Sequence, residues 1–151
     1  MKFVETVVIN RGPSAVWDLL TDFKNYSEWT GNNEKIIIKS LGESKQGLKF
    51  QQIGSISGRN YSIDNKVMEW VDDKKLSLVT TSHYGTGYIT YELTKDPAGT
   101  RIFLTSELFF SKQYRHAALI IYRELQVSMR FFLERLKEHL EKQKLGNKKF
   151  L

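Results

Sequence analysis

The sequence predicts an α+β fold: a seven-stranded, curved antiparallel sheet wrapped around one long C-terminal helix, with two short helices between strands 1 and 2. Three observations predict it. A β-branched first segment ends at Gly12-Pro13 and gives way to apolar residues at helical spacing. Short polar turns then separate six further strand-like segments. From Ser111 to Lys144 there is no glycine or proline, and apolar residues recur every three or four positions.

The N-terminal elements follow from local residue preferences. Residues 2–10 are rich in β-branched side chains, which favour a strand. Pro13 suits the first turn of a helix, because its missing N–H is not needed there. Asp22 is a candidate cap for a second short helix that ends near Trp29. The side chains expected to face the core from the first helical segment are Val16, Leu19, Leu20 and Phe23.

The middle of the chain reads as sequential antiparallel strands, because turns of three to six residues join them. The C-terminal segment reads as one amphipathic helix, on the order of 50 Å long, with Ser111 as its cap and Gly146 as its stop signal. We therefore expect a single domain over residues 1–146, followed by a basic tail over 147–151. The expected strands cover residues 35–41, 48–56, 61–71, 76–83, 87–94 and 101–110.

The charge of the chain is unevenly distributed. Its 151 residues suffice for one hydrophobic core, and the formal net charge is +6. Residues 1–110 carry 13 basic and 13 acidic side chains, whereas residues 111–151 carry 10 basic and 4 acidic ones. These cations either contact phosphates or an anionic membrane or form a solvated helix end that favours the C-terminal dipole. No aromatic residues interleave with them, so we expect no specific nucleic-acid partner. The lysines concerned are Lys142, Lys144, Lys148 and Lys149.

Several classes of site have no signature in the sequence. The chain has no cysteine, which excludes disulfides and thiolate metal sites. Its three histidines are not at metal-ligand spacing. Gly85-Thr86-Gly87 lacks the third glycine of a dinucleotide fingerprint, so its glycines more simply permit a turn or bulge. We therefore expect no metal and no cofactor.

The chain also lacks a run of about 18 apolar residues, the length that a membrane span needs. We expect a cytoplasmic protein, either a monomer or a homodimer. Leu119-Ile120-Ile121 makes the start of the long helix apolar nearly all round. We expect the short helices and loops to cover this segment, although a second subunit is the alternative.

The alternation along the strands predicts one buried and one solvated sheet face. A single helix about 10 Å wide does not fill the concavity of a strongly twisted sheet, so we expect a cavity between sheet and helix. The alternative is that the inward side chains are ordinary core residues with satisfied polar groups. The residues expected to line the cavity are Tyr61, Asn65, Thr80, Tyr91, Ser106 and Phe110 from the strands, and Tyr122, Leu125, Ser128, Met129 and Phe132 from the helix.

The order of elements resembles the START-like, helix-grip superfamily, also called SRPBCC or Bet v 1-like. The segment from Pro13 to Trp29, with the pattern Pro-x-x-Val-Trp-Asp-x-Leu-x-Asp-Phe-x-x-Tyr-x-x-Trp, is similar to its polyketide cyclase/dehydrase-like branch. Gly58-Arg59 and the turn at Gly99-Thr100-Arg101 fit the same branch. The chain lacks the glycine-rich loop of pollen-allergen relatives. The resemblance covers essentially the whole chain and implies binding of hydrophobic ligands such as lipids, polyketides or steroids, with catalysis in a minority of members.

We therefore expect a binding or carrier protein for a small hydrophobic molecule. One alternative is a cyclase or dehydratase-like enzyme that acts in the same cavity, with His83, His116 and Tyr91 as candidate catalytic groups. Another alternative is an interaction protein that uses its basic C-terminal end.

Overall fold

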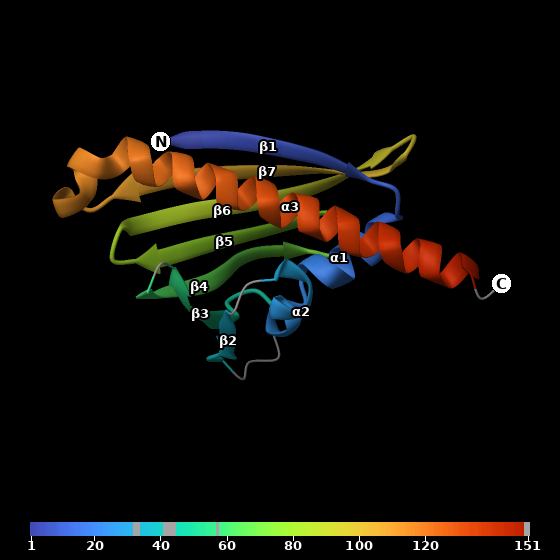
Figure 1. Ribbon diagram of the computed structural model, residues 1–151, viewed down its shortest axis with the longest axis horizontal. Coiled ribbons are helices and arrows are strands. Elements are labelled where there is room, and N and C mark those ends of the chain that lie inside the picture. Colours follow the sequence, from blue (N-terminus) through green and yellow to red (C-terminus); the bar gives the residue numbers. More distant parts are fainter. Residues whose placement is uncertain (32–33, 41–44, 57, 150–151) are drawn as a thin grey trace.

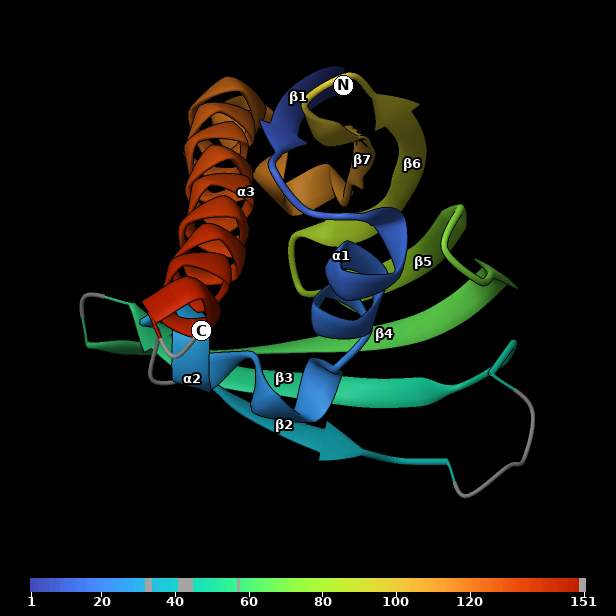
Figure 2. The same ribbon diagram turned by 90° about the vertical axis from the view of Figure 1, so that its right-hand side faces the viewer.

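The computed structural model describes residues 1–31, 34–40, 45–56 and 58–149, with backbone only at 56, 59 and 144–149. Seven strands form one antiparallel sheet in the order β1-β7-β6-β5-β4-β3-β2. Figure 1 shows α3 lying along this sheet, and Figure 2 shows the sheet curving from β1 round to β2. The elements are β1 (Lys2–Ile9), α1 (Pro13–Leu20), the 3-10 turn η1 (Phe23–Asn25), α2 (Ser27–Thr30), β2 (Lys35–Ile38), β3 (Lys49–Ile56), β4 (Arg59–Val71), β5 (Lys75–Ser82), β6 (Gly85–Asp96), β7 (Gly99–Phe110), the 3-10 helix η2 (Lys112–Ala117) and α3 (Ala118–Lys149).

The predicted fold class is confirmed, while several boundaries differ from expectation, most of them by one or two residues. The helix begins as the 3-10 segment η2, with Ser111 at the N-cap position as expected. The Ser111 hydroxyl donates to the carbonyls of His83 and Tyr84 and makes no capping hydrogen bond. The helix also continues through Gly146 to Lys149, so the predicted stop is wrong. A glycine inside a helix costs only about 1 kcal/mol, which good helix formers on both sides can offset. The second strand ends at Ile38, and its expected last residue, 41, lies outside the described residues.

The sheet register arranges inward-facing side chains in rows across the strands. Asn65 of β4 lies opposite Phe50 of β3 and Thr80 of β5. Thr80 in turn lies opposite Gly87 of β6, where any Cβ would crowd the threonine hydroxyl. A second row contains Val67, Leu78, Ile89, Ser106 and Phe3. A third contains Trp70, Leu76, Tyr91, Leu104 and Glu5.

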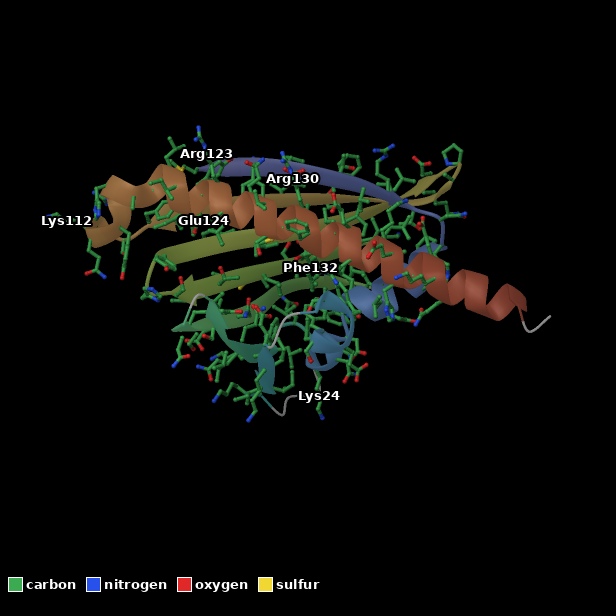
Figure 3. The ribbon with its side chains drawn as sticks, viewed as in Figure 1. Lys24, Lys112, Arg123, Glu124, Arg130 and Phe132 are labelled. Carbon is green, nitrogen blue, oxygen red and sulfur yellow. The ribbon has the colours of Figure 1, made fainter. Side chains whose placement is uncertain are left out.

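Helix α3 is tied to the edge strand β1. Arg130 and Gln126 donate to the carboxylate of Glu5 at 2.8 and 2.9 Å. About two turns further on, the ammonium of Lys137 donates to the carbonyl of Val8 at 2.6 Å. Figure 3 shows Arg130 on the β1 side of α3 and Phe132 on the side toward the sheet. The helix therefore lies over β1 and presents its other side to the inner face of the sheet.

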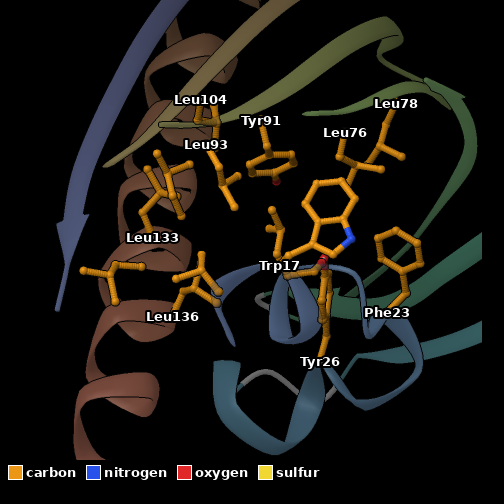
Figure 4. Packing of buried hydrophobic residues seen from close by; sticks show 14 of the residues in the cluster. Trp17, Phe23, Tyr26, Leu76, Leu78, Tyr91, Leu93, Leu104, Leu133 and Leu136 are labelled. Atoms are coloured by element: carbon orange, nitrogen blue, oxygen red, sulfur yellow. The ribbon is translucent and has the colours of Figure 1, made fainter. Parts of the chain in front are cut away.

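The hydrophobic core is closed at one end of this inner face. Leu136 and Leu140 of α3, and Ile102 and Leu104 of β7, are at most 1% exposed. Figure 4 shows this packing between α3, the sheet and the short helices. Trp17 of α1 is 4% exposed and contacts Trp70 edge-on, with ring centroids 5.3 Å apart. The aromatic residues of the first 30 positions thus act mainly as packing between the short helices and the sheet.

Candidate ligand-binding site

The opposite end of the inner face is only half-buried, and we call it the open end. It lies beside the first half of α3, because Tyr122 bonds the carbonyl of Lys2, and Lys2 pairs with Glu107 near the end of β7. Apolar side chains that remain partly exposed to solvent come from both sides. They are Ile89, Leu108 and Phe110 from the sheet and Leu125, Met129 and Phe132 from the helix.

Phe132 joins the open end to the closed core. Its ring lies 5.1 Å from that of Trp29, 5.4 Å from Tyr26 and 6.0 Å from Tyr91, measured between ring centroids. The three partners are 6 or 7% exposed, whereas Phe132 itself is half-buried. Aromatic pairs of this kind stabilise the fold by more than their buried area alone would give. These four rings separate the open end from the closed core, and we call them the aromatic floor: Tyr26, Trp29, Tyr91 and Phe132.

Two polar groups in this floor lack a partner among the described residues. The indole N–H of Trp29 is buried and donates to nothing in that part of the chain. The hydroxyl of Tyr91 likewise has no hydrogen bond to any described residue. Tyr26 differs, because its hydroxyl donates to the carbonyl of Leu20. Buried polar groups are normally paired, and Trp29 Nε1 is the exception among the described residues. The Tyr91 hydroxyl, which is not in that fully buried class, is the donor that a ligand with an acceptor can reach.

Burial raises the pKa of Tyr91, so its phenol is a hydrogen-bond donor and not a base at neutral pH. In the unfolded chain the tyrosine loses its proton near pH 10, while the folded protein retains it to higher pH. Stability is therefore lost as the pH rises above about 10. Tyr91→Phe should reduce this loss relative to the wild type, measured as the free energy of unfolding in urea at pH 9, 10 and 11. Equal losses in the two proteins would contradict the assigned environment.

A series of hydrogen-bonded polar side chains, here called the polar chain, crosses the inner face on the strands farthest from β1. The hydroxyl of Tyr61 donates to one carboxylate oxygen of Glu34, and the amide of Gln52 donates to the other at 3.2 Å. The amide of Asn65 donates to Gln52 at 2.9 Å. Burial and the bond to Glu34 raise the pKa of Tyr61. Sequence reasoning named Tyr61 and Asn65 and missed Glu34 and Gln52, although Gln52 shares its strand face with the apolar Phe50.

The remaining expected lining residues divide into four groups. Ser106 is 7% exposed on the inner face, between Phe3 and Ile89 in the register. Tyr122 is half-buried at the β1 edge, where its hydroxyl donates to the carbonyl of Lys2 at 2.8 Å. Ser128 is exposed, so its predicted inward position is wrong. Thr80, Phe110, Leu125 and Met129 lie at the open end.

The structure does not bring the three candidate catalytic residues together. His83 is exposed, and its ring lies 4.1 Å from that of Tyr84 and 5.6 Å from that of Tyr114. His116 is exposed in η2, beside a surface depression of about 630 Å³ that Ser111, Lys112 and Gln113 also line. Tyr91 is buried on the inner face.

A second surface depression, of about 570 Å³, lies outside the inner face. It is lined by Pro13, Ser14, residues 73–75 and residues 92–95. Neither depression lies between the sheet and α3, where the sequence predicts a cavity. The open end is recognised by the partial exposure of its apolar side chains.

The start of α3 is less covered than expected. Leu119 and Ile120 are 53 and 65% exposed, so the expectation that other parts of the chain cover them is wrong. Ile121, by contrast, is half-buried. Lys142 is exposed, and the side chains of the other expected tail lysines, Lys144, Lys148 and Lys149, lie outside the described residues.

The described part of the chain holds neither a metal-ligand cluster nor a helix suited to span a membrane. Residues 1–31, 34–40, 45–56 and 58–149 contain no group of three or more His, Cys, Asp or Glu side chains that could hold a metal ion. Within those ranges, no helix combines the length and apolarity that crossing a membrane requires.

Comparisons with known proteins agree with this architecture. The model of the family "polyketide cyclase / dehydrase and lipid transport" matches residues 1–141. No curated protein matches the sequence. Similar solved structures include the Zhui aromatase/cyclase from Streptomyces sp. R1128 (TM-score 0.81, 14% identity, covering 95% of this chain and 94% of that one). They also include protein MLL2253 from Mesorhizobium loti (0.69, 23%, 94% and 98%) and Ara h 8.0201 (0.76, 10%, 94% and 98%). The TM-scores show a shared fold, and at identities below 25% the likeness shows the fold alone.

Proposed function

Because the chain belongs to the polyketide cyclase/dehydrase and lipid transport family, we propose that it binds a small hydrophobic molecule at the open end, between the sheet and the first half of α3. The observation that carries the proposal is the pair of partly exposed apolar surfaces that face this region, one from β6 and β7 and one from α3. Leaving apolar surface in water costs about 25 cal/mol per Å². A bound apolar molecule would remove that cost on both surfaces together.

The polar groups around the open end support a ligand with oriented polar atoms. Trp29 and Tyr91 offer two donors without partners in the described residues. The hydrogen-bonded side chains that link Glu34 to Asn65 offer further polar atoms. Mostly apolar walls with a few convergent polar groups are the usual design of small-molecule sites. A carrier needs only such a binding site and no catalytic group. The cytoplasmic location and the oligomeric state stay predictions from the sequence.

The experiment is a titration of the full chain with the apolar fluorescent probe 1-aminoanthracene, paired with mass spectrometry of organic extracts of the purified protein. We expect saturable binding, with one probe per chain, or a co-purified hydrophobic molecule that displaces the probe. Failure to bind the probe, in protein whose extract contains no small molecule, would contradict the proposal.

A cyclase or dehydratase acting in the same place is the second candidate, and one observation favours it. The Tyr91 phenol is buried, protonated and unpaired among the described residues, so it could polarise a carbonyl of a bound substrate. The two histidines lie on the surface and do not assist it. A carrier predicts that the bound molecule is recovered unchanged, whereas an enzyme predicts a product whose formation falls in Tyr91→Phe.

A further inference from the structure

The polar chain on β3 and β4 has a fixed hydrogen-bond direction. It consists of Tyr61, Glu34, Gln52 and Asn65, and each link is within hydrogen-bond distance. Gly54 lies opposite Tyr61 in the register, and any Cβ there would collide with the tyrosine ring. The glycine therefore leaves the room that Tyr61 needs to reach Glu34. The arrangement is built by residues from three separate segments of the chain.

Glu34 sets the direction because an ionised carboxylate only accepts hydrogen bonds. Gln52 must then turn its NH₂ group toward Glu34, which leaves its carbonyl oxygen for the next member. Asn65 must in turn present its NH₂ group to that oxygen, at 2.9 Å. The second hydrogen of the Asn65 amide points to the carbonyl of Ile63 at 3.4 Å. Both donors of Asn65 are thus used within the protein.

The acceptor of Asn65 is left over. Its Oδ1 has no partner among the described residues, although the residue is only 4% exposed. Its neighbour in the register, Thr80, also has a hydroxyl with no partner in the described part of the chain. Among the described residues the one fully buried side-chain N or O atom without a partner is Trp29 Nε1, so the Asn65 oxygen is reached by solvent. A ligand with a donor could therefore replace water at this acceptor.

We infer that the site selects apolar molecules that carry a hydroxyl or N–H group, because the carboxylate of Glu34, acting through Gln52, leaves Asn65 with only an acceptor to offer. The inference rests on the proposed function and adds the class of ligand to it. Phenols and hydroxylated polycyclic molecules fit this chemistry. Their methyl ethers, which lack the donor, do not.

The test uses a matched pair of probes, 1-naphthol and 1-methoxynaphthalene, each displacing 1-aminoanthracene from the full chain. The wild type should prefer the naphthol by roughly three- to tenfold, the size of one hydrogen bond. Asn65→Leu should bring the ratio close to one, with the affinity for the ether retained. Glu34→Gln should also lower the ratio, because a glutamine can donate to Gln52 and so allow both amides downstream to reverse.

The control is Gln51→Leu, on the solvated face of β3, where the Gln51 amide donates to the hydroxyl of Ser62 at 2.7 Å. The ratio of its affinities for 1-naphthol and 1-methoxynaphthalene should equal that of the wild type. Since Glu34 is half-buried before β2, Glu34→Gln keeps the test valid if Asn65→Leu does not fold. Equal affinities of the wild type for the two probes, or an unchanged ratio in Glu34→Gln, would overturn the inference and leave the proposed function standing. Absence of binding by both probes would overturn the two together.

Discussion

Replacement of Leu136 by alanine is expected to lower the free energy of unfolding by about 2–5 kcal/mol. Leu136 is 0% exposed and lies on the side of α3 that packs into the closed end of the core. Removing its side chain leaves a cavity that neighbours such as Leu133 and Leu140 fill only in part. For a chain of 151 residues, a loss of this size is a large fraction of typical total stability.

The matched control is Phe131→Ala on the same helix. Phe131 is 58% exposed, so the change should alter the free energy of unfolding by less than about 0.5 kcal/mol. Both values come from urea unfolding followed by circular dichroism. If Phe131→Ala were as damaging as Leu136→Ala, the face that α3 buries would have been assigned wrongly.

Thr80→Trp is expected to weaken binding of 1-aminoanthracene by about tenfold or more. Thr80 is half-buried on the inner face, and its register partner on β6 is Gly87, which has no side chain. An indole at position 80 would extend over that glycine and occupy the space assigned to the ligand. Because Thr80 is not fully buried, the fold should tolerate the larger side chain better than a core position would.

Thr81→Trp is the control, because Thr81 is adjacent in sequence, exposed and on the other face of β5. It adds the same indole outside the proposed site, so probe affinity should stay within about twofold of the wild type. Equal losses in the two variants would show that the effect is not specific to the inner face. Unchanged binding in Thr80→Trp would move the site away from the open end.

Much of the fold follows from the sequence because strand alternation is a local signal. Alternation along residues 101–110 places Ile102, Leu104 and Ser106 on one face, and they are 0, 0 and 7% exposed. Phe103, between them, is 38% exposed. Successive side chains of a strand point to opposite faces of the sheet. Once one face is buried, this alternation fixes which residues of the strand point inward. Helical spacing, together with the absence of glycine and proline, similarly predicted the long C-terminal helix.

The features that sequence reasoning missed depend on how elements pack. Helical periodicity alone could not tell that α3 lies along β1, so Ser128 was placed inward although it is exposed. Glu34 precedes a short strand and has no pattern that marks it as a partner of Tyr61, 27 positions away. The exposure of Leu119 and Ile120 depends on where the short helices lie. Helix α2 contacts α3 further along, where Trp29 packs against Phe132, and so leaves the start of α3 uncovered.

The central claim is that an apolar molecule lies between the sheet and the first half of α3. The most direct measurement is the set of intermolecular nuclear Overhauser effects between bound 1-aminoanthracene and the methyl groups of the protein. The account predicts contacts to Met129 and Leu125 of the helix together with Leu108 and Ile89 of the sheet. Contacts to the exposed methyl groups of Leu119 and Ile120, with none to the sheet residues, would contradict it.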